Sequence, residues 1–183
     1  LSADRSGVLW VGTSVGLARV SGSTVAMFLP DASPARPVTA VAATSTGVVW
    51  VGTDKGLARF QNGHLADVDL PSLASATITA LLEDSTGAVW VAFTAGNRVW
   101  VAHTLDHDAH WGAPYEMPVA NASVGSEDIA SILAFGPGRI GVIWSSQPRN
   151  SVFFSTHQDG ASDDAWTAPE IVLDGIGSSD DRL

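Results

Sequence analysis

The sequence has 183 residues, of which 45% are hydrophobic and 15% charged, a composition typical of a folded globular chain rather than a disordered one. Its formal net charge is −10 and Lys55 is its only lysine, which argues against binding to the phosphate backbone of a nucleic acid. The chain lacks cysteine, which excludes disulfides and thiolate metal sites, and it lacks an apolar run of about 18 residues that would insert into a membrane.

A segment near the start of the chain is repeated forty residues later. The segments "GVLWVGTSVGLARV" at 7–20 and "GVVWVGTDKGLARF" at 47–60 are identical at ten of fourteen positions. The tryptophans Trp10, Trp50 and Trp90 are spaced by 40 residues, each with a glycine three positions before it and another six positions after it. A looser fourth copy, "GRIGVIWSSQPRNSVFFST" at 138–156, contains Trp144.

Each repeat contains four short segments that predict β-strands. An apolar run comes first, as in "VTAVAAT" at 38–44, and a glycine turn follows it. The tryptophan segment is apolar on both faces, a tight turn ends in glycine, and two further strands follow, the last one weakly marked. Four strands in about forty residues are typical of one blade of a β-propeller. The glycines suit hairpin turns that place a residue at positive φ.

The sequence therefore predicts an all-β chain, a β-propeller segment of four-stranded antiparallel blades. We place the blades at residues 1–37, 38–76, 77–127 and 128–177, with 178–183 beginning the next blade. The first blade is expected to be incomplete, without its first strand. Because closed propellers have about four to eight blades, we interpret the segment as part of a larger ring, with a closed four-bladed ring as the alternative.

The repeated tryptophans have two possible roles. Exposed aromatic side chains form platforms for sugars, whereas aromatic side chains in the middle of an apolar strand pack in a core. Trp10, Trp50 and Trp90 occupy the same position of three apolar strands. We therefore expect them to be buried between blades.

The first half of the chain resembles a known family. "TSTGVVWVGTDKGLARF" and "EDSTGAVWVA" are similar to the two-component regulator propeller repeat, D-x-x-G-x-x-W-x-G-T-x-x-G-L-x-R/K-F, over residues 1–100. The resemblance implies a sensor propeller of a membrane-linked bacterial regulator, or a secreted protein with the same repeat. It also implies an extracellular or periplasmic location.

The second half, residues 100–175, resembles a different kind of blade. "TLDHDAHW" at 104–111 has the spacing of the Asp-box of sialidase-like propellers, and "STHQDGASDDAW" at 155–166 looks like a second copy with an insertion. The resemblance implies a structural turn remote from any active site. We expect a hairpin with its turn at 105–110, in which Asp106 accepts backbone N–H groups and Trp111 packs beneath.

Metal binding and catalysis are weaker interpretations of the same residues. The side chains that would form a metal cluster are His103, Asp106, His107, Asp108 and His110. Alternate side chains of a hairpin point in opposite directions, so we expect these histidines not to converge. A sialidase site needs an arginine cluster, but Arg139 and Arg149 are the only arginines between residues 99 and 181. Tyr115 and Glu116 are adjacent and would face opposite sides of a strand. We therefore expect no catalytic residue, metal or cofactor here.

The turn between the second and third strands of each blade is the expected ligand-binding region. In propellers these turns share one face around the channel mouth, where loops from every blade converge. The candidate residues are Asp54, Lys55, Asn97, Arg149 and Asn150. Lys55 and Arg149 would give this face a positive focus for an anionic sugar or carboxylate, although simple solubilisation of the turns is the plainer alternative.

Three functions remain open at this stage. The first is a non-catalytic ligand-sensing or interaction propeller, exported or membrane-linked, with a small molecule or carbohydrate as ligand and the remaining blades of the same chain as partners. The second is part of a sialidase-like or carbohydrate-active enzyme whose catalytic residues lie outside this segment. The third is a structural adhesion module.

Overall fold

The computed structural model describes residues 1–29, 35–106 and 110–175. Contacts divide the chain into two compact units, Leu1–Glu83 and Asp84–Leu183. The described residues form four four-stranded sheets and one 3₁₀ turn, and they contain no α-helix. No helix in this part of the chain is therefore long and apolar enough to cross a membrane.

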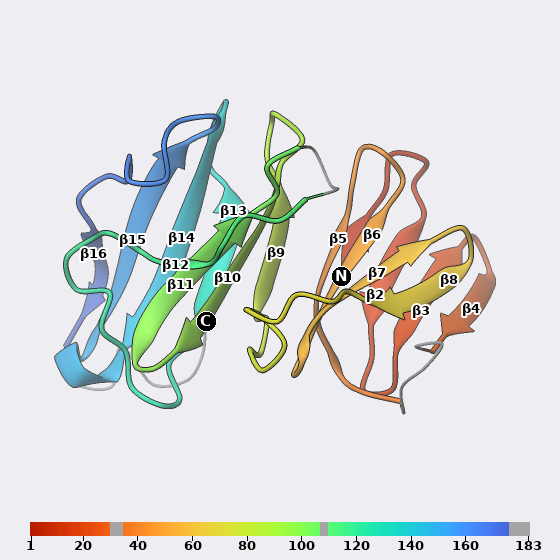
Figure 1. The fold of residues 1–183 in the computed structure, drawn as a ribbon, viewed down its shortest axis with the longest axis horizontal. Coiled ribbons are helices and arrows are strands. Elements are labelled where there is room, and N and C mark those ends of the chain that lie inside the picture. The colour runs from red at the N-terminus through yellow and green to blue at the C-terminus, as the bar shows by residue number, and fades with distance from the viewer. Residues whose placement is uncertain (30–34, 107–109, 176–183) are drawn as a thin grey trace. The chain divides into compact units, whose positions relative to one another are not determined.

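The strands of the first unit are drawn in red to yellow-green in Figure 1. The first sheet has the order β1-β2-β3-β4 and the second the order β5-β6-β7-β8, so each is a simple meander. The strands are β1 (Ser2–Ala3), β2 (Leu9–Gly12), β3 (Leu17–Ser21), β4 (Thr24–Phe28), β5 (Val38–Ala43), β6 (Val49–Thr53), β7 (Gly56–Gln61), β8 (His64–Asp67) and β9 (Ala80–Glu83).

The strands of the second unit follow the same plan. The third sheet has the order β12-β11-β10-β9 and the fourth β13-β14-β15-β16. The elements are β10 (Val89–Ala95), β11 (Arg98–His103), β12 (Tyr115–Glu116), β13 (Ala130–Ala134), β14 (Arg139–Ser146), η1 (Gln147–Arg149), β15 (Ser151–Gln158) and β16 (Glu170–Asp174). The prediction of four-stranded antiparallel sheets is thus confirmed. Each sheet lies within one of the four expected blade ranges, whose limits stay a prediction.

One expectation about the first blade was wrong. Its first strand is present as β1, in which Ser2 pairs with Trp10 and Ala3 with Leu9. Two residues carry no periodic pattern, so sequence alone could not show them. The expected start of a further blade at 178–183 lies outside the described residues.

The repeated tryptophans are buried, as predicted. The exposed fractions of Trp10, Trp50 and Trp90 are 6%, 1% and 2%. In the first unit the Trp10 ring lies 4.8 Å from that of Phe60, so it packs between the first and second sheets. In the second unit the Trp90 ring stacks at 4.3 Å on His103 and lies 5.2 Å from His157 of the fourth sheet. Trp10 and Trp90 therefore each join two neighbouring sheets.

Two of these indoles are each hydrogen-bonded to an aspartate in the turn that precedes the tryptophan strand. Asp84 accepts the backbone N–H groups of Thr86 and Ala88 at 2.8 and 3.0 Å, and its second oxygen accepts the Trp90 indole N–H at 2.8 Å. Asp4 repeats the arrangement with Ser6, Val8 and Trp10. The hydrogen bond from the Ser6 side chain, with the others, lowers the pKa of Asp4. One carboxylate thus shapes the turn and fixes the indole.

We predict that Asp84→Ala lowers the free energy of unfolding by about 1–3 kcal/mol, because it leaves a buried indole N–H and two turn amides without their acceptor. The matched control is Asp69→Ala, since Asp69 is exposed and outside every strand. Denaturant unfolding of the two variants measures the difference. Equal stability of both variants would contradict the role given to Asp84.

A second prediction uses Tyr115, the only tyrosine in the sequence. Burial, and secondarily the charge of Asp163, raises the pKa of this phenol well above its usual value. Among the described residues its hydroxyl is buried without a hydrogen-bond partner, although the Trp166 indole lies near. The folded state therefore disfavours tyrosinate, and stability falls as the pH rises above about 10, the pKa of an unfolded tyrosine. Tyrosinate absorbance should appear only with alkaline unfolding. Ionisation near pH 10 in the folded protein would contradict the buried position.

Candidate functional site

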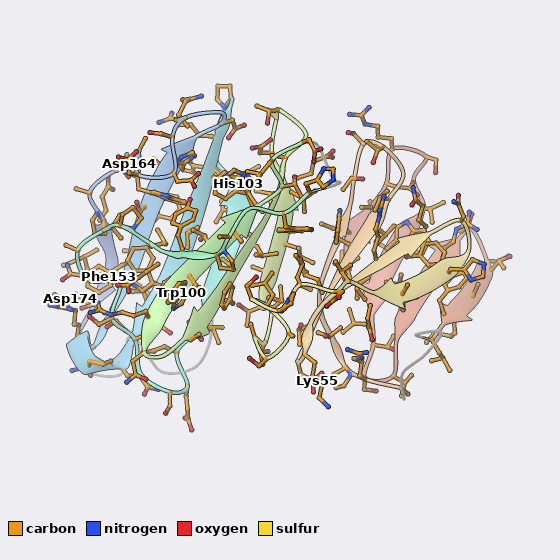
Figure 2. The ribbon with its side chains drawn as sticks, in the orientation of Figure 1. Lys55, Trp100, His103, Phe153, Asp164 and Asp174 are labelled. Atoms are coloured by element: carbon orange, nitrogen blue, oxygen red, sulfur yellow. The ribbon has the colours of Figure 1, made fainter. Side chains whose placement is uncertain are left out.

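The turn between β6 and β7 carries the first two candidate residues. Thr53 builds it, because its hydroxyl donates to the Gly56 carbonyl at 3.0 Å and accepts the Lys55 N–H at 3.1 Å. Asp54 and Lys55 are both exposed at the tip, and Figure 2 shows the Lys55 side chain extending away from the ribbon. Gly56 closes the turn at φ +94°, where an added Cβ would lie 2.7 Å from the Leu73 carbonyl oxygen. The local fold therefore presents these two charged side chains to solvent.

The corresponding turns of the second unit carry the other three candidates. Asn97 ends the β10–β11 turn at φ 62°, and Asn150 ends η1 at φ 51°. Asparagine tolerates this left-handed region better than most residues, so both have a backbone role in their turns. Asn97, Arg149 and Asn150 are exposed. The turn conformation of Asn97 does not involve its side-chain amide. The Arg149 guanidinium is likewise not needed to form its turn.

Asp128 connects these two turns, and sequence reasoning missed it. The exposed fraction of Asp128 is 2%, and its Oδ2 accepts the N–H groups of Gly125 and of Gln147, the latter at 2.8 Å. The Thr94 hydroxyl donates to the Asp128 carbonyl at 3.2 Å. The sequence places Asp128 directly after the turn sequence "VGSE", which could have suggested a turn-forming role. Its partner Gln147 is nineteen residues away, and no local pattern predicts that the two residues meet. Asp128 thus holds the β14–β15 turn beside the segment that precedes β13.

A cleft of about 240 Å³ opens beside the β10–β11 turn. Its walls are the end of β10 with that turn and the segment 124–126. The lining residues are Thr94, Ala95, Gly96, Asn97, Val124, Gly125 and Ser126. Of the five residues predicted from sequence, only Asn97 lines it. Arg149 and Asn150 lie in the turn that Asp128 anchors through Gln147.

The opposite end of the third sheet carries the turn that resembles an Asp-box. Thr104 and Trp111 form a bridge, and Asp106 accepts the His110 N–H at 2.7 Å. The second copy closes with a bridge between His157 and Trp166. Asp106 thus accepts a backbone N–H within its turn, as expected, while residues 107–109 of that turn lie outside the described residues. A hydrogen bond from the His110 side chain lowers the pKa of Asp106.

The histidines near this turn separate rather than converge. His103 places Nε2 2.9 Å from Asp163 and Nδ1 2.9 Å from the Thr104 carbonyl, whereas His110 pairs with Asp106. His107 and Asp108 lie outside the described residues. In the described ranges no three histidine, aspartate or glutamate side chains form a cluster suited to a metal ion.

Tyr115 and Glu116 belong to neighbouring cross-strand pairs of β12. Tyr115 is opposite Val101 and Glu116 opposite Trp100, so their side chains lie on opposite faces. Glu116 forms an ion pair with Arg98 at 3.4 Å. This geometry does not join the two into the nucleophile pair of a sialidase-like site.

A second cavity, of about 220 Å³, lies at this same end of the sheet. Asp84, Trp90, His103 and Gly160 are among its lining residues. Each of these polar groups already has a partner: Asp84 holds Trp90, and His103 holds Asp163. The Asp84 and His103 side chains that line this cavity are therefore engaged within the protein.

Comparisons with known proteins agree with the fold. The chain matches no protein-family model and no curated protein. It is similar to the extracellular domain assigned to the hybrid two-component system BT4673 of B. thetaiotaomicron, with 19% identity, a TM-score of 0.60, and coverage of 91% of this chain and 21% of that one. A catalytically inactive virginiamycin B lyase from Staphylococcus aureus, solved with quinupristin, gives 14% identity and a TM-score of 0.65, covering 96% and 55%.

A third similar structure is the Hadza microbial sialidase Hz136, with 14% identity, a TM-score of 0.59, and coverage of 92% of this chain and 45% of that one. The chain therefore spans 21%, 55% and 45% of the lengths of these three structures. Identities this low show the fold alone. Together with the four-stranded sheets, they establish that the chain is a β-propeller segment, similar to both a sensor propeller and sialidase-like propellers.

Proposed function

We propose that the chain is a non-catalytic ligand-sensing or interaction propeller of an exported or membrane-linked bacterial protein. The observation that supports this proposal is a difference between the two ends of the sheets, which is clearest in the third sheet. At one end, carboxylates are engaged in turn formation and in holding indoles, as at Asp84 and Asp106. At the other end, the β6–β7, β10–β11 and β14–β15 turns present exposed polar side chains. The similarity to an extracellular sensor domain supports the same interpretation.

The proposed ligand-binding residues are Asp54, Lys55, Asn97, Arg149 and Asn150, and the remaining blades of the same propeller are the proposed partners. Lys55 and Arg149 are exposed and lie at equivalent turns of two sheets. In a chain of net charge −10 they attract an anionic sugar or carboxylate that the rest of the surface repels. The similarity to the lyase and to the sialidase is a similarity of fold, and we propose no enzymatic activity for this chain.

We predict that the protein binds acidic oligosaccharides or carboxylates in a glycan-binding screen, and that Lys55→Ala and Arg149→Ala each weaken the dissociation constant by at least about threefold, or 0.7 kcal/mol. The matched control is Arg5→Ala, because Arg5 is exposed in the β1–β2 turn, at the other end of its sheet. Binding that neither turn variant weakens would place the site elsewhere and contradict this assignment.

A further inference from the structure

We propose that the cleft between the β10–β11 turn and the segment 124–126 binds one hydroxyl-rich sugar ring through neutral hydrogen-bonding groups. This inference rests on the proposed function, because it names the ligand class for one part of the same set of turns. It assigns to Ser126 and Thr94 a binding role that the sequence did not indicate.

The lining groups fit hydroxyls better than ions. The lining residues include Thr94 and Ser126, which carry hydroxyls, and Asn97, which carries an amide, and none of the lining residues is charged. A hydroxyl and a primary amide each donate and accept hydrogen bonds. Vicinal sugar hydroxyls also donate and accept, whereas a carboxylate needs donors and a cation needs acceptors. The cleft is therefore complementary to a polyol.

Two of these groups are free to bind. The Asn97 amide and the Ser126 hydroxyl are exposed and have no hydrogen-bond partner in the part of the chain that the structure describes. Thr94, which also lines the cleft, donates its proton to the Asp128 carbonyl, so its oxygen can still accept a hydrogen bond. A ligand would thus meet one fixed acceptor and two groups of adjustable polarity.

The walls of the cleft are held in place before any ligand arrives. The Val124 N–H donates to the Asn97 carbonyl at 3.0 Å, and the Val99 N–H donates to the Ala122 carbonyl at 3.1 Å. The Trp100 indole N–H donates to the Ala95 carbonyl at 3.0 Å. Both sides of the cleft are therefore fixed by hydrogen bonds, which reduces the ordering cost of binding.

Glycines keep the cleft open. A Cβ on Gly125 would lie 3.0 Å from Gln147 Oε1 and 3.2 Å from Asp128 Oδ2, so a side chain there would disturb the Asp128 anchor. Gly96 has open space around it, which lets a ligand approach the main chain. The volume of about 240 Å³ is below the range of about 300–1,000 Å³ that drug-sized ligands occupy. One ring fits better than a longer segment of chain.

The test titrates the full-length propeller that contains residues 1–183 with xylobiose, with digalacturonate and with a tetraalanine peptide, by calorimetry or ligand-observed NMR. We expect both sugars to bind. Asn97→Gly and Ser126→Ala should each weaken both by about fivefold, the size expected for one neutral hydrogen bond. Asn97→Gly removes the amide while glycine retains the left-handed backbone. The matched control is Asn62→Gly, since Asn62 has φ 52° in the β7–β8 turn.

The outcomes separate this inference from the proposed function. Binding of digalacturonate alone, lost in Arg149→Ala and unchanged in Asn97→Gly, would overturn the inference and leave the proposed function standing. Binding of the peptide alone would overturn it, as would the absence of binding of both sugars at millimolar concentration. An unchanged thermal unfolding midpoint in each variant excludes loss of fold as the cause of weaker binding.

Discussion

The buried indole held by a carboxylate is the interaction on which this architecture depends. A tryptophan in the second strand packs between two sheets, and a hydrogen-bond partner for its N–H group lowers the cost of burying it. Asp4 and Asp84 supply that partner and shape the turn before the strand with the same side chain. The spacing of aspartate, glycine and tryptophan thus links a local turn to the packing of a neighbouring sheet.

Acidic residues also join successive sheets through these turns. Glu83 accepts both the N–H and the hydroxyl of Ser45 in the first unit, and Asp159 accepts the N–H of Ser85 in the second. Part of the negative charge of the chain therefore serves its packing. At the opposite end Asp128 holds the β14–β15 turn through Gln147, while the side chains at the turn tips, such as Lys55 and Arg149, are exposed.

The strand plan could be predicted because the repeat places apolar residues, glycine and tryptophan at fixed intervals. Asp106 could be predicted because its partner is four residues away. Asp128 could not, since its role depends on Gln147 across two strands, and neither could the pairing of His103 with Asp163, sixty residues apart. The exposure of Lys55 and Arg149 could be predicted because both residues lie in turns. The cleft beside Asn97 could not be predicted, because it depends on where the segment 124–126 folds back against the β10–β11 turn.

The central claim is that ligands bind at the second-to-third strand turns of the sheets and not at the Asp-box end. Hydrogen–deuterium exchange of the protein, with and without a mixture of neutral and acidic oligosaccharides, tests it directly. The account predicts slower exchange on ligand addition at residues 54–55, 94–97, 124–126 and 147–150. Protection confined to the turn around Asp106 and to the loop that follows β15 would contradict it.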